Sequence, residues 1–305
     1  MNTEPALTRD FPIGHRTRFA ETAQRWLRGE IEPAKAELAA TVMLVRDRAD
    51  EAHGEEPPRD VAGSALEVFL MRRVASMEFA PSVLVFPGGR VDPRDAQADL
   101  EWAGRGPGGW AEVLGTDEAA ARLLVTAAIR ELFEECGVLL AGPDADSVVA
   151  DVSSPTWHDR RMALTRHEIS LAEVLAAEGL VLRSDLLSYR AHWVTPGFET
   201  RRYDTRFFCA VLPEGQVPDG RTSEADHAQW ADPAEMLAAL ERGEVMMLPP
   251  TQACLEDIAD APSIQALTTD AAEVPLVMPE PIVLDSGELV LRTPLPPRTA
   301  AGGAR

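Results

Sequence analysis

Three glutamates fall within one short stretch of the chain, residues 130–138, whose sequence is RELFEECGV. Glu131 precedes Glu134 and Glu135 by three and four residues, so on a helix all three carboxylates lie on one face. Like charges repel each other, and a hard divalent cation that prefers oxygen ligands would relieve the repulsion. A run of acids is also typical of a solvated helix end, so this stretch alone leaves both interpretations open.

A second motif, Phe86-Pro87-Gly88-Gly89, follows an apolar run that predicts a strand over 82–86. Because glycine has no side chain, its backbone groups can approach a metal or a ligand closely. Arg130, next to the glutamates, has the fork geometry to hold one carboxylate through two hydrogen bonds. Taken together, the two motifs favour a metal site.

These residues resemble the sequence box of the Nudix hydrolase family. In that box a glycine, five residues, an acid and seven residues precede Arg-Glu-apolar-x-Glu-Glu-x-Gly-apolar. Gly89 stands at the glycine, and Asp95 stands at the acid, where the family has glutamate. The remaining positions are filled by Arg130, Glu131, Glu134, Glu135 and Gly137, with Leu132 and Val138 as the apolar residues.

The spacing of the box departs from the family pattern, because residues 96–129 stand where seven residues are usual. This interruption is similar to that of a Nudix subgroup that includes the coenzyme A diphosphatases of Nudix type 19. The segments 192–196, 201–208 and 249–251 extend the resemblance, which spans about residues 37–260.

The resemblance implies an α+β Nudix fold, in which a mixed β-sheet lies between helices as an α/β/α sandwich. It also implies hydrolysis of the diphosphate linkage in a nucleoside diphosphate derivative, a small-molecule substrate, with Mg²⁺ or Mn²⁺ as cofactor. Glu134, Glu135 and the Gly89 carbonyl would hold the metal. Glu131 would be a further ligand or the carboxylate that deprotonates water, and Arg130 would orient it.

Some Nudix enzymes take the general base from a later loop, where Glu224 is the candidate in this chain. An exposed loop acid is an equally good interpretation of Glu224. The substitution at Asp95 and the long interruption favour an alternative function, a catalytically silent Nudix-fold module that binds nucleotides or regulates.

Arg201, Arg202 and Arg206 form the densest basic cluster near the predicted sheet and are the candidates for substrate binding. Successive residues of a strand point to opposite faces, so at most one or two of them reach a phosphate and the rest lie at the surface or pair with Asp204. The coenzyme A signature of the family is broken at Glu78 and Ser82, which leaves coenzyme A or acyl-CoA, NADH, ADP-ribose and nucleotide sugars as candidate substrates.

The elements that would position these residues follow from periodicity and turn residues. We expect an N-terminal extension over 1–36, a Nudix domain over 37–262 and a Pro-rich tail over 263–305 that contains a β-hairpin. Strands are predicted at 39–46, 66–71, 82–86, 191–195 and 206–212. Helices are predicted at 19–27, from 117 to Gly137 with Thr116 as N-cap, at 232–242 and after Pro250. The stretch 96–115, with its glycines 104–109, is interpreted as a flexible inserted loop.

The composition of the chain limits the classes of molecule that we expect it to bind. The chain has 305 residues, with 50 acidic and 29 basic side chains and a net charge of −21, which disfavours nucleic-acid binding. Its three cysteines form no disulfide framework. No apolar run is long enough for a signal peptide or a membrane span, so a cytoplasmic protein without a membrane partner is the expectation, with a homodimer left open.

Overall fold

The computed structural model describes residues 7–13, 17–48, 65–74, 82–97, 99–222, 225–271 and 273–296. Two residues of the sequence predictions, Glu78 and Glu224, lie outside the described residues. Within the described ranges, no helix combines the length and the apolar character that crossing a membrane would require.

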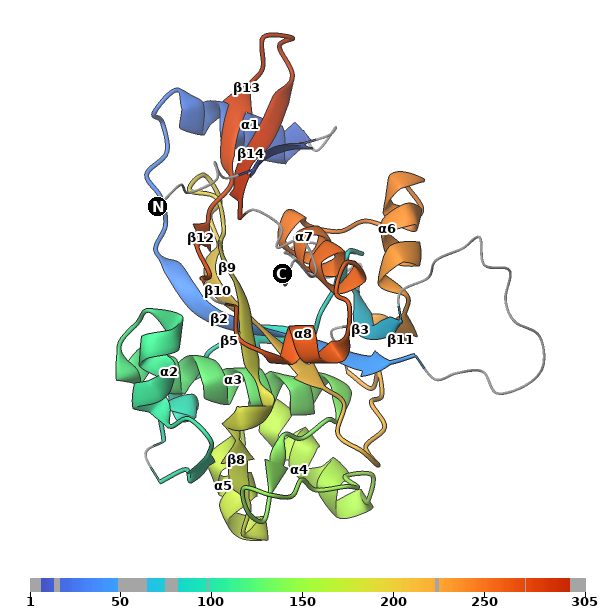
Figure 1. Ribbon diagram of the computed structural model, residues 1–305. Coiled ribbons are helices and arrows are strands. Elements are labelled where there is room, and N and C mark those ends of the chain that lie inside the picture. The colour runs from blue at the N-terminus through green and yellow to red at the C-terminus, as the bar shows by residue number, and fades with distance from the viewer. Residues whose placement is uncertain are drawn as a thin grey trace, which may run out of the picture.

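An eight-stranded mixed sheet forms the centre of the molecule (Figure 1). Its strands lie in the order β11-β3-β2-β10-β9-β12, with β4 paired to β3 and β5 paired to β2. β10 runs parallel to β2, and β12 runs parallel to β9, while the other pairs are antiparallel. The strands are β2 (Ala36–Asp47), β3 (Leu66–Arg73), β4 (Leu84–Val85), β5 (Gly88–Arg90), β9 (Ser188–Val194), β10 (Arg202–Val211), β11 (Ala225–Ala231) and β12 (Leu276–Val277).

Helices cover both faces of this sheet. α3 (Glu118–Cys136) lies on one face, and α6 (Pro233–Glu241), α7 (Pro249–Ala259) and α8 (Ile264–Thr268) lie on the other (Figure 1). Successive side chains of β10 point to opposite faces of the sheet. Phe208 therefore packs in the core beside α3, and Phe207 packs in the core beside α7. The predicted α/β/α arrangement is confirmed.

Local signals fix the ends of α3. Asp117, rather than the predicted Thr116, is the N-cap, and its side chain accepts a hydrogen bond of 2.8 Å from the Ala120 amide. Gly137 ends the helix in the left-handed conformation with a φ of 69°, which glycine adopts without steric cost. Most of the helix between these ends is buried, and this packing fixes the position of the helix against the sheet.

The prediction of a flexible loop over 96–115 was wrong. This stretch contains a short strand, β6 (Trp102–Ala103), and a helix, α2 (Pro107–Leu114), which begins directly after the N-cap Gly106. Trp110 and Leu114 are buried in the core that α3 shares. Burial of these two apolar side chains stabilises a helix that the surrounding glycines would not predict.

A further layer packs beside α3 and was not predicted. It consists of α4 (Pro155–Thr165), α5 (Leu171–Glu178) and a second sheet in the order β6-β8-β7. The strands β7 (Ala141–Gly142) and β8 (Val181–Arg183) join β6 there, so the inserted stretch is anchored to a segment about 80 residues later in the chain.

The two ends of the described chain form one unit. β1 (Leu7–Pro12) pairs with β14 (Leu289–Leu295), which pairs in turn with β13 (Glu280–Val283), and α1 (Thr17–Leu27) packs beside them (Figure 1). The predicted hairpin is therefore present as β13 and β14. Phe19 of α1 stacks edge-on against Phe198 with ring centroids 4.9 Å apart, which ties this unit to the end of β9.

Candidate active site

The first residues of β5 and the last turns of α3 meet in close contact. The amide nitrogen of Gly88 donates a hydrogen bond of 2.6 Å to Oε2 of Glu135. A β-carbon built on Gly89 would lie 2.5 Å from Oε1 of Glu131, closer than real side chains come. At Gly88 a β-carbon would instead lie 2.5 Å from the Ala40 carbonyl oxygen, so β2 excludes a side chain at position 88 and Glu131 excludes one at position 89.

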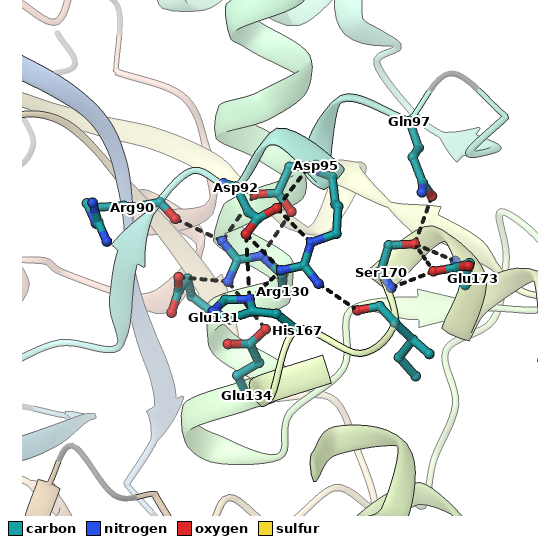
Figure 2. Close-up of polar contacts among 12 residues, drawn as sticks. Arg90, Asp92, Asp95, Gln97, Arg130, Glu131, Glu134, His167, Ser170 and Glu173 are labelled. Atoms are coloured by element: carbon teal, nitrogen blue, oxygen red, sulfur yellow. Dashed lines mark hydrogen bonds and ion pairs between the residues drawn. The ribbon is translucent and has the colours of Figure 1, made fainter. Parts of the chain in front are cut away.

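Arg130 connects the two halves of the motif, although 34 residues separate Asp95 from it. Its guanidinium donates from Nε to Oδ1 of Asp95 at 2.9 Å and from Nη2 to Oδ2 at 3.1 Å (Figure 2). Nη2 also donates to the carbonyl of Arg90 at 2.9 Å. Arg130 therefore holds a carboxylate bidentately, as its fork geometry predicted, and that carboxylate is Asp95.

The same guanidinium also contacts two of the glutamates. Nη1 of Arg130 lies 2.8 Å from Oε1 of Glu131 and 3.3 Å from Oε1 of Glu134. Burial lowers the pKa of Arg130, but the charges of Glu131, Asp95 and Glu134 outweigh burial and raise it above its usual value. One fixed cation thus faces several buried acids.

The positive charge of Arg130 does not fully offset the cost of burying the acidic side chains of this cluster. Burial raises the pKa of Glu134 despite the nearby charge of Arg130, and burial likewise raises the pKa of Asp95. A raised carboxyl pKa means that the folded protein favours the neutral form more than water does. The site therefore carries an electrostatic cost that an added cation would reduce.

The donor set suits a hard divalent cation, because it consists of carboxylates beside strand residues whose backbone admits no side chain. Among the described residues, no group of three or more His, Cys, Asp or Glu side chains is already gathered at metal-holding distance. The oxygens of Glu131 and Glu134 face Arg130, and an oxygen of Glu135 faces the Gly88 amide. Glu131, Glu134, Glu135 and the Gly89 backbone are the groups that would turn toward a metal.

A polar cluster beside the glutamates was not predicted from the sequence. Arg94 donates to both oxygens of Asp92 at 2.8 Å, and this pair holds the pKa of Asp92 well below its usual range. His167, which follows α4, contacts Arg94, and its Nδ1 lies 3.5 Å from Oδ2 of Asp92 (Figure 2). No motif contains His167, and only the packing of α4 against α3 brings it to this place.

A cavity of about 850 Å³ opens beside Gly88 on the α7 face of the sheet. The unit built from the two chain ends forms one wall, through Arg18, Phe19 and Thr22 of α1 and Leu291 of β14. The sheet supplies aromatic side chains, and the start of α7 closes the far side. The aromatic lining consists of Phe19, Phe86, Trp193, Tyr203 and Phe207.

The three predicted substrate-binding arginines lie in different surroundings. Arg201 lines the 850 Å³ cavity and also a smaller cavity of about 330 Å³, which Arg202 lines as well. Arg206 is buried on the opposite face of β10, where it contacts Asp204 and His192. Arg206 is thus the member of the cluster that pairs with Asp204, a pairing that the sequence analysis left open.

Nudix hydrolases are among the known proteins that this chain resembles in sequence and in structure. Residues 112–256 match the family model of the NUDT19 Nudix domain. A Nudix hydrolase structure from Alicyclobacillus acidocaldarius is 27% identical, with a TM-score of 0.62, and the match covers 79% of this chain and 99% of that one. The chain is therefore similar to Nudix hydrolases in sequence and shares their fold.

The Nudix relatives include two proteins named acyl-coenzyme A diphosphatase NUDT19. The human protein is 26% identical over 259 residues, covering 72% of this chain and 67% of the relative. The chicken (Gallus gallus) protein is 29% identical over 255 residues, covering 70% and 65%. Across the curated relatives reported for the family, the chain spans between about half and two thirds of their length.

Proposed function

We propose that this protein is a divalent-metal-dependent hydrolase that cleaves the diphosphate linkage of a nucleoside diphosphate derivative. The observation that carries the proposal is the approach of Glu131 and Glu135 of α3 to the backbone of Gly88 and Gly89, next to a cavity of about 850 Å³. A cavity of this size falls within the range of small-molecule sites, and its aromatic lining suits a nucleobase.

Glu134, Glu135 and the carbonyl of Gly89 would hold Mg²⁺ or Mn²⁺, with Glu131 as a further ligand or as the proton acceptor. A divalent cation held by these residues would supply neutralisation of charge on the phosphoryl oxygens and a lower pKa for an attacking water. Glu131 is our first candidate to take the proton from water, because it lies against Gly89 and is oriented by Arg130. Arg130 is a positioning residue in this scheme, since Asp95 and the Arg90 carbonyl fix its guanidinium.

Glu224 is the second candidate for the general base. It lies outside the described residues, directly before β11 in the chain. Replacement of Glu131 and of Glu224 by glutamine, each in a separate variant, distinguishes the two. The pH profile of kcat loses its acidic limb in the variant that lacks the base.

The relatives' name, acyl-coenzyme A diphosphatase, makes coenzyme A and acyl-CoA the first substrates to test. Residues lining the large cavity combine arginines with apolar and aromatic side chains, which suits an anionic nucleotide with an extended organic group. NADH, ADP-ribose and nucleotide sugars share the diphosphate linkage and complete the set of candidates.

The test is a panel of these five compound types, with Mg²⁺ or Mn²⁺ and with a chelator. We expect metal-dependent turnover of at least one compound and a loss of kcat of at least about a hundredfold in Glu134→Gln. Glu118→Gln is the matched control, because it makes the same change at an exposed position in the first turn of the same helix. Turnover without metal, or equal kcat in both variants, contradicts the proposal.

The alternative function, a silent binding module, makes a different prediction for the same panel. Such a module binds one of the compounds and releases it unchanged at every metal concentration. Calorimetry of each compound, run beside the turnover assay, therefore separates the two functions.

A further inference from the structure

The smaller cavity, of about 330 Å³, lies where three strand ends meet. Lys35 stands directly before β2, Arg90 ends β5, and the segment Thr200–Tyr203 leads into β10. The register of the sheet explains the meeting, because Arg202 lies opposite Ala36 of β2 and Arg90 lies opposite Ala39 of the same strand. Residues from three distant parts of the sequence thus face one small volume.

The charge of this cavity is opposite to that of the protein. Four cationic side chains, Lys35, Arg90, Arg201 and Arg202, line it together with one carboxylate, that of Glu37. The chain carries a net charge of −21, and Lys35 is its only lysine. In an acidic protein, a concentration of positive charge in a concave site creates a local field that attracts anions.

Arg202 is held in place without being neutralised. Its Nε donates to the carbonyls of Thr195 at 3.0 Å and Pro196 at 3.1 Å, and its Nη1 donates to the carbonyl of Ala34 at 2.7 Å. Within the described part of the chain, no carboxylate lies within ion-pair distance of Arg202 or Lys35. A cation that neutral oxygens orient is ready to bind an anion at little entropic cost.

The smaller cavity lies beside the larger one. Thr200, Arg201 and Tyr203 line both cavities. Gly88 borders the larger cavity and Arg90 borders the smaller one, on either side of Gly89. A ligand whose diphosphate lies at Gly89 can therefore extend into both.

We propose that the 330 Å³ cavity binds a phosphate monoester of the substrate, separate from the diphosphate that is cleaved. This inference rests on the proposed function and names its substrate class: nucleoside diphosphate derivatives whose ribose carries an additional phosphate. A phosphate monoester carries about −1.5 to −2 charges near neutral pH, whereas each phosphate of the cleaved linkage carries about −1. The monoester therefore gains more from a site where Lys35 and Arg202 offer positive charge that no described carboxylate neutralises.

The kinetic test compares substrates that differ by one phosphate. Coenzyme A is paired with 3′-dephospho-coenzyme A, and NADPH is paired with NADH. We expect kcat/KM to favour the phosphorylated member of at least one pair by about tenfold to a hundredfold, the gain typical of charge-assisted hydrogen bonds. Equal kcat/KM within both pairs, in an enzyme that turns them over, overturns the proposal and leaves the proposed function intact.

Lys35→Glu is the variant for this test, because Lys35 is exposed and lies outside the proposed catalytic residues. The charge reversal is expected to lower the preference by about tenfold while kcat for the dephosphorylated member stays the same. Arg242→Glu makes the same change of charge at an exposed position on the end of α6 and should leave the preference unchanged. An equal loss in both variants would show that only overall charge matters, and would overturn the assignment of this cavity.

A second test does not depend on hydrolysis. Because Lys35 is the only lysine, acylation of its amine by an activated ester can be followed at one position by peptide mass mapping. Adenosine 3′,5′-bisphosphate or adenosine 2′,5′-bisphosphate should slow acylation at Lys35 by at least about threefold relative to adenosine at equal concentration. If adenosine and both bisphosphates protect equally, the proposal fails, even when the diphosphatase activity is present.

Discussion

Glu131 lies so close to Gly89 that a β-carbon at position 89 would be 2.5 Å from its Oε1. This contact joins the two halves of the Nudix box, the glycine before the interruption and the glutamates after it. It also means that position 89 determines where the Glu131 carboxylate can be.

Gly89→Ala should therefore inactivate the protein without unfolding it. The methyl group would displace the Glu131 carboxylate, and a displacement of about 1 Å in a catalytic group costs about a hundredfold in kcat. Gly106→Ala is the matched control, because a β-carbon there would meet no atom within 4 Å. Unchanged kcat in Gly89→Ala with the best substrate of the panel would show that this contact is not part of catalysis.

Asp95→Asn should destabilise the fold. The Asp95 and Arg130 side chains are only 1% and 5% exposed, so removing the carboxylate leaves a buried guanidinium without its bidentate partner. Because Arg130 keeps its contacts with Glu131 and Glu134, we expect the free energy of unfolding to fall by about 1–3 kcal/mol in urea denaturation. Asp95→Glu restores the family residue and keeps the charge, so it should lose much less. Similar losses in the two variants would mean that side-chain volume, rather than charge, determines this position.

The ion pair of Asp204 with Arg206 predicts a pH dependence. Burial alone would raise the pKa of Asp204, but the hydrogen bond with His192 and the charge of Arg206 lower it below its ordinary value. A lowered carboxyl pKa contributes stability above the unfolded pKa, and this contribution is lost as the pH falls through the folded pKa.

Asp204→Asn should therefore lower the free energy of unfolding at pH 7 by about 2–3 kcal/mol. The difference from the unsubstituted protein should shrink as the pH falls below the ordinary aspartate pKa and through the lower pKa of the folded protein, because the native carboxylate then becomes protonated. Urea midpoints of both proteins across this range provide the measurement. A constant difference at every pH would rule out the carboxylate charge as its source.

Arg18→Ala tests whether helix α1 is part of the substrate site. Arg18 is exposed and lines the 850 Å³ cavity away from the glutamates, so its loss should raise KM severalfold and leave kcat unchanged. Arg25→Ala removes an exposed arginine of the same helix that pairs with Glu30, and should change neither constant. A decrease of kcat in Arg18→Ala would indicate a role other than binding.

Local sequence signals were sufficient for much of the fold. Helix α3 was predicted to within one residue at its start because an acidic N-cap, apolar periodicity and Gly137 are all local features. The strands β2, β3, β9 and β10 also follow from short apolar runs. By contrast, helix α2 was missed, since the burial of Trp110 that stabilises it depends on α3.

The sequence by itself determined which chemical groups the candidate site contains, because the spacing of Glu131, Glu134 and Glu135 fixes one helical face. Alternation along β10 also required Arg201, Arg202 and Arg206 to divide between its faces. The packing around β10 decided which arginine faces a cavity. Arg206 pairs with Asp204, whereas Arg202 lines the smaller cavity together with Lys35. Hydrogen bonds within a helix or a strand follow from nearby residues, whereas the cavities arise from strands and chain ends that only the folded chain brings together.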